Sequence, residues 1–94
     1  MAKQDQGAET IALQALGWLV ANDDLLPVFL GATGASEADL RSSAGSPAFL
    51  AAVLDFLLMD DAWIIACADD IAIAPERLAE ARRALPGGEG VHWT

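Results

Sequence analysis

The chain contains one cysteine and one histidine, Cys67 and His92, and such side chains can form a nucleophile and its general base. A catalytic thiolate needs an accessible, electropositive setting that lowers the thiol pKa. Cys67 instead lies in the apolar run 62–68 and is followed by Asp69 and Asp70. Apolar surroundings and nearby carboxylates both raise the pKa of a thiol. The sequence therefore predicts no catalytic residue and no enzymatic activity.

Three adjacent pairs of aspartates could supply carboxylate oxygens to a divalent cation. These pairs are Asp23-Asp24, Asp60-Asp61 and Asp69-Asp70. None has the Asp-x-Asp-x-Asp-Gly spacing of a calcium loop, and two of them stand where a helix N-cap is expected. A single histidine provides no two-histidine zinc motif. The glycine-rich segment 86–90 also lacks the Lys-Ser/Thr of a phosphate-binding loop, so we expect neither a metal nor a cofactor.

Tryptophans are the side chains best suited to recognising a partner. Trp93 follows His92 beyond the glycine-rich hinge, and a large ring on such a tether should dock, either on the domain's own core or in the groove of a partner. Trp18 falls at the edge of the apolar face of the first predicted helix, where it is either core or rim. Trp63 is expected in the core. The candidate interaction residues are therefore Trp18, His92 and Trp93.

Apolar residues recur at three- and four-residue steps along most of the chain, which predicts helices. Serine-proline at 46–47 is the clearest start signal, and Ser36 with Asp39 resembles a capping box. A helix beginning near Pro75 is expected to end before residues 86–88. The predicted helices cover 8–21, 25–30, 36–41, 47–59 and 75–85, with a fifth in chain order that follows an Asp60-Asp61 cap and ends between 69 and 73.

No alternating pattern is long enough to propose a strand, so the predicted fold is all-α. The segment 47–59 is apolar nearly all round except at Asp55, which is typical of a helix at the centre of a bundle. We expect one domain over residues 1–94, a compact bundle of five to six short helices around this central helix. Residues 1–7 are predicted to form a polar N-terminal tail and residues 86–94 a glycine-rich hinge and C-terminal tail.

Fourteen acidic residues stand against five basic ones, for a net charge of −9, and residues 5–70 hold eleven acids and one base, Arg41. An acidic surface repels phosphate, so direct binding to nucleic acids or to anionic membranes is not expected. The polar N-terminus shows no signal-peptide pattern, and cytoplasm is the expected compartment. Because 54% of the residues are hydrophobic, a chain of this size should leave some apolar surface exposed.

Several segments resemble an uncharacterised family of small alphaproteobacterial proteins, a domain of unknown function. The resemblance is strongest in Pro47-Ala48-Phe49-Leu50-Ala51-Ala52-Val53-Leu54-Asp55-Phe56-Leu57-Leu58, in Asp60-Asp61-Ala62-Trp63, in Leu85-Pro86-Gly87-Gly88 and in His92-Trp93-Thr94. It implies no activity, cofactor or catalytic residue. The family pattern suggests a glycine ending the helix after Cys67, whereas this chain has no glycine in 69–72.

Together these features predict a small cytoplasmic protein-protein interaction or adaptor module. A homo-oligomeric structural protein, the simplest form being a homodimer, is the alternative. An acidic decoy of a basic nucleic-acid-binding surface is a third reading. The apolar excess and the tethered Trp93 favour the first interpretation.

Overall fold

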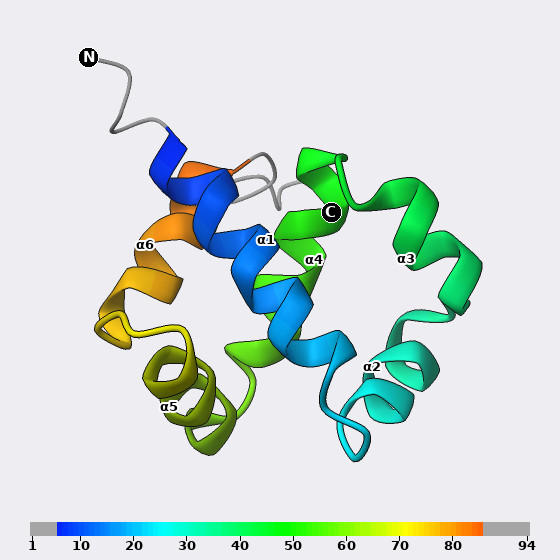
Figure 1. Cartoon of the computed structure of the whole chain (residues 1–94). Helices are drawn as coiled ribbons and strands as arrows, with labels where there is room; N and C mark the ends of the chain where they lie inside the picture. The colour runs from blue at the N-terminus through cyan, green and yellow to red at the C-terminus, as the bar shows by residue number, and fades with distance from the viewer. Residues whose placement is uncertain (1–5, 86–94) are drawn as a thin grey trace.

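Six helices form the part of the chain that the computed structural model describes, residues 6–85 (Figure 1). They are α1 (Gln6–Val20), α2 (Leu26–Thr33), α3 (Glu37–Ser43), α4 (Pro47–Leu57), α5 (Asp61–Asp70) and α6 (Glu76–Ala84). No strand is present in these residues. The predicted all-α fold of five to six short helices is confirmed.

Three helix starts follow the predicted capping chemistry. Ser36 and Asp39 form a full capping box, in which the Ser36 hydroxyl accepts from the Asp39 amide and the Asp39 carboxylate accepts from the Ser36 amide. The Ser46 hydroxyl accepts from the Phe49 amide at 3.3 Å, ahead of a proline in the first turn of α4. Asp60 accepts from the amide of Ala62 at 2.8 Å and begins α5.

Other helix ends differ from the sequence prediction. Helix α1 begins at Gln6, inside the predicted N-terminal tail, because its first turn packs beside α6. Helix α4 ends at Leu57 instead of Met59, since Asp60 must adopt an extended backbone to cap α5. Helix α2 has no side-chain cap. The side-chain oxygen of Asn22 accepts from the amides of Asp24 and Leu25, and these hydrogen bonds stabilise a turn that precedes α2.

Helix α4 lies at the centre of the core, as predicted. Six of its eleven residues are buried, and α1 and α6 pack against it and against each other most closely. Figure 1 shows α1 crossing in front of α4, with α5 and α6 on one side and α2 and α3 on the other. All of the buried side chains belong to one apolar cluster, and none of those in residues 7–85 is polar.

Aromatic rings attach the outer helices to this centre. The fully buried ring of Phe29, on α2, meets Phe49 and Phe56 of α4 edge-to-face, at centroid distances of 6.1 and 5.2 Å. Trp63 of α5 is half-buried and stacks on Phe56 at 4.8 Å. Phe56 therefore links three helices, and the expectation that Trp63 packs with the core is confirmed.

Asp55, the one charged residue of α4, is paired with α6. Its carboxylate accepts from the Nε of Arg82 and, at 3.1 Å, from the Nη2 of the same guanidinium. This fork-to-carboxylate geometry favours arginine over lysine, because a lysine presents a single charged centre. The pair lets an otherwise apolar helix meet α6 at the edge of the core.

The end of α5 has the hydrogen-bond pattern of a Schellman motif without a glycine. The amide of Ile73 donates to the Ala68 carbonyl at 3.0 Å and the amide of Ala72 donates to Asp69 at 3.2 Å. Ala72 carries a left-handed φ of 64°, the only such non-glycine residue in 6–85. The glycine expected near this position on the basis of the family resemblance is thus replaced by an alanine in the conformation that a glycine prefers.

Replacing Ala72 with glycine should increase the free energy of unfolding by about 0.5–1 kcal/mol. The left-handed conformation costs an L-residue about 1–2 kcal/mol, and glycine removes this cost. The extra freedom of glycine in the unfolded chain offsets part of the gain. Thermal unfolding of A72G measures the change. The control A66G, at an exposed position inside α5, should lower stability by about 1 kcal/mol. A lower free energy of unfolding in A72G than in wild type would show that Ala72 is not strained.

Candidate interaction surface

Cys67 shows no sign of being a nucleophile. Its side chain is fully buried on the inner side of α5, where burial and, to a smaller extent, the charge of Asp70 raise the pKa of the thiol to about 11. Both causes are those that its sequence neighbours indicated. His92, its only conceivable imidazole partner, lies outside the described residues.

The three aspartate pairs do not converge. Asp60 is occupied as the cap of α5, and Asp70 accepts a hydrogen bond from a tryptophan. Within residues 6–85 no group of three histidine, cysteine or carboxylate side chains is arranged to hold a metal ion. In the same part of the chain, no helix has both the length and the apolar character needed to cross a bilayer.

Trp18, the candidate interaction residue within the described chain, is half-buried at the rim between α1 and α5. Its indole Nε1 donates to the Oδ2 of Asp70 at 2.6 Å, which ties the end of α1 to the end of α5. A shallow hollow beside it is lined by polar groups of Asn22 and Asp23. The structure therefore gives Trp18 a partner within its own chain. The other two candidates, His92 and Trp93, lie outside the described residues, and their role stays a prediction.

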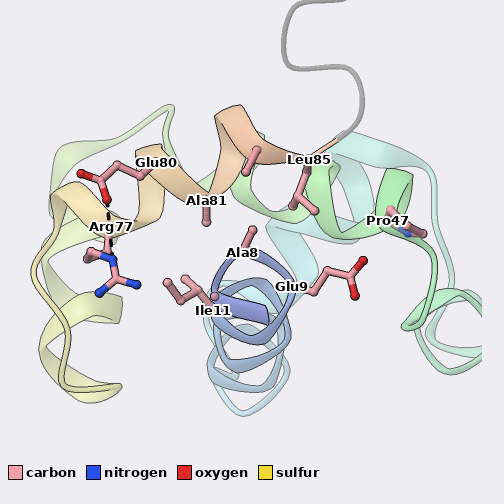
Figure 2. Close-up of a pocket in the computed structure, with 10 residues that line it drawn as sticks. Ala8, Glu9, Ile11, Pro47, Arg77, Glu80, Ala81 and Leu85 are labelled. Atoms are coloured by element: carbon pink, nitrogen blue, oxygen red, sulfur yellow. Dashed lines mark ion pairs between the residues drawn. The ribbon is translucent and has the colours of Figure 1, made fainter. Parts of the chain in front are cut away.

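A groove of about 490 Å³ is lined by the first turns of α1, by α6 and by Pro47 at the start of α4 (Figure 2). Figure 2 shows apolar side chains in its middle, from Ala8, Ile11, Ala81 and Leu85, with Arg77 and Glu80 at one end. The Nε of Arg77 and the Oε1 of Glu80 are 3.6 Å apart. None of the lining residues that the structure describes is a cysteine, histidine, serine or threonine.

A second groove, of about 390 Å³, lies between α1 and the α2–α3 pair. Its apolar wall consists of Leu16, Val20, Leu26 and Leu40. Charged side chains of Asp23, Glu37 and Arg41 also line it. Val20 is exposed and belongs both to this groove and to the outer surface of α1, so the two form one continuous surface.

The outer face of α1 is the feature that sequence reasoning missed. We use this name for the exposed residues Thr10, Leu13, Gln14, Gly17 and Val20. Leu13 and Val20 are 47% and 43% exposed, and they are seven positions apart, which places them on one line of the helix. No charged residue occurs between Glu9 and Asp23, in a chain of net charge −9. This uncharged stretch was visible in the sequence, but its exposure was not.

Gly17 lies in the middle of this face. A Cβ added there would meet no atom within 4 Å. Glycine inside a helix costs about 1 kcal/mol relative to alanine, and no contact within the described residues explains why the position holds one. The backbone of α1 is therefore open to close approach from outside.

Comparison with known proteins assigns a family but no activity. The sequence model of a family described as "Protein of unknown function (DUF3572)" matches residues 5–88. No curated protein and no solved structure gives a significant match to the chain. The resemblance to a domain of unknown function is confirmed, while its alphaproteobacterial range stays a prediction.

Cys67 should resist thiol reagents near pH 8 in the native protein and react only when the protein unfolds. The pKa of about 11 in the folded protein exceeds the ordinary thiol value of 9.0. The contribution of Cys67 to stability is therefore fully present below about pH 9 and is lost as the pH rises towards 11. Labelling rates with and without denaturant test the first point. Unfolding of wild type and C67A at pH 8 and 11 tests the second: an equal decline in both proteins would contradict it.

Removing the indole N–H in W18F should lower the free energy of unfolding by about 1 kcal/mol, the size of a typical hydrogen bond at a partly exposed site. D70A should cost a similar amount, and the double variant W18F/D70A should cost less than the sum of the two. Denaturant unfolding of the four proteins gives this coupling. Strict additivity would show that the bond does not stabilise the fold and would leave Trp18 free to serve a partner.

Proposed function

Because this chain belongs to the DUF3572 family, whose description names no activity, we propose its function from its surface: a small protein-protein interaction module that acts through the outer face of α1 and the adjoining groove. It works in the cytoplasm and without a cofactor. Its acidic charge disfavours nucleic acids and anionic membranes as partners.

One observation carries the proposal, the uncharged and partly apolar outer face of α1 in a protein of net charge −9. A solvent-facing side of a helix is ordinarily polar, but here Leu13 and Val20 are exposed along one line with Gly17 between them. Exposed apolar patches of this kind on small proteins mark sites of association. Single exposed side chains such as Met59 and Ile65 need no such explanation.

The described interior supports a binding role over a catalytic one. Catalysis needs polar groups held in fixed positions and shielded from water. In residues 7–85 the structure buries no polar or charged side chain, and the buried thiol of Cys67 is kept protonated by its surroundings. The described part of the chain instead has grooves and exposed apolar side chains that a partner can contact.

The substitution Leu13→Lys should abolish the contact by placing a charge on the line that Leu13 and Val20 form. Ile65→Lys is the matched control, since it makes the same change at a similarly exposed position of α5. Each tagged protein would be used to capture proteins from a lysate of the source organism, after circular dichroism has shown that all three fold. We expect wild type and I65K to retain a shared set of proteins that L13K retains at least about tenfold less.

Identical retention by the three proteins would rule out the outer face of α1 as the interaction surface. Loss of retention in both lysine variants would show that the effect comes from charge and not from this face.

A further inference from the structure

We infer that the outer face of α1 binds a second copy of this chain, with two α1 helices crossing at Gly17. This inference rests on the proposed function and names the partner. It is carried by the distribution of charge, by the position of the glycine and by the length of the exposed helix face.

Charge limits which surfaces of this protein can pair with themselves. Two copies each carry a net charge of −9, so any contact that brings acidic side chains together is opposed. Exposed carboxylates occur on α3, α4, α5 and α6. Helix α1 has no charged residue after Glu9, and α2 has none, but α2 is only eight residues long and exposes one large hydrophobic side chain, Val28. The outer face of α1 therefore offers a second copy an apolar contact without repulsion at its centre. A basic partner would instead bind the acidic surfaces of other helices.

Gly17 gives this face the shape that helix crossing needs. Because it has no side chain, the backbone of a second helix can approach closely at that point, with Leu13 one turn before it and Val20 nearly one turn after it. In a two-fold dimer the same patch is used by both copies, and the residue at the crossing point meets its own equivalent. No contact within residues 6–85 explains Gly17, and this helix crossing accounts for it.

The size of the face predicts a reversible dimer. Helix α1 has 15 residues and is about 22 Å long, so the contact is smaller than the roughly 800 Å² per partner of a standard interface even with the adjoining groove included. We expect dissociation constants in the micromolar range or weaker. Such a dimer forms and separates with protein concentration.

Sedimentation equilibrium of the full chain at two salt concentrations tests the inference. Because salt screens the repulsion between two acidic copies, dimerisation should strengthen when sodium chloride is raised from about 0.05 to about 0.5 M. Association with a basic protein weakens under the same change. A chain that stays monomeric at about 1 mM at both salt concentrations, or a dimer that L13K leaves intact, would overturn the inference.

Gly17→Ala separates this role from folding. The alanine should raise the thermal midpoint of the dilute monomer by a few degrees, because alanine favours the helix over glycine. It should also raise the dissociation constant of the dimer about tenfold, because its methyl group blocks the crossing. In a Cys67→Ala background, Gly17→Cys should form a disulfide-linked dimer under mild oxidation, whereas Ile65→Cys should not, since the bridge requires Cα atoms within about 7 Å. Equal cross-linking at both positions would contradict the crossing point.

Failure of this inference can be told apart from failure of the proposed function. If the chain is monomeric but L13K loses captured proteins that I65K retains, the partner is a different protein and the interaction surface stands. If L13K changes neither self-association nor capture, both proposals fail.

Discussion

Helix α4 is apolar on nearly every side, and a helix of this kind can exist in water only when other helices cover it. Six of its eleven residues are buried, and the closest packing in the molecule is that of α1 and α6 on α4 and on each other. Helices α2 and α3 each bury one large side chain, Phe29 and Leu40, whereas α5 buries Ile64, Cys67 and Ala68. The arrangement of the whole chain follows from the need to surround one short apolar helix.

Covering α4 with short helices has a consequence for the surface. Helix α1 contributes one apolar side to α4 and α6, yet its opposite side is uncharged and partly apolar as well. A chain of this size has too little buried volume to hide all of its hydrophobic residues. Part of the surplus lies on α1, where Val20 also lines the adjoining groove, and the rest is spread over Val28, Met59 and Ile65. The proposed interaction surface is the side of α1 that faces away from the core.

Electrostatics separates this surface from the rest of the protein. Several acids have local structural tasks: Asp39 and Asp60 cap helices, Asp55 meets Arg82 and Asp70 accepts from Trp18. Their negative charge keeps most of the exterior unfavourable for self-contact and for phosphate-bearing partners. Helix α1 beyond Glu9 and helix α2 carry no charged residue. Under the proposed function, this distribution of charge restricts which surfaces associate.

The sequence by itself determined the helices and several of their ends, because these depend on residues close together in the chain. Ser36 with Asp39, Ser46 with Pro47, and Asp60 each cap a helix through contacts two or three residues away, and the apolar run of α4 required a central position. Only the tertiary structure decided where α1 begins, because its first turn is stabilised by α6, some seventy residues further along. The same holds for Trp18, whose partner Asp70 is 52 positions away, and for Leu13, Gly17 and Val20, whose exposure depends on which side of α1 meets α4. Periodicity shows that a helix has an apolar side, but when both sides are free of charge, packing alone determines which one remains in water.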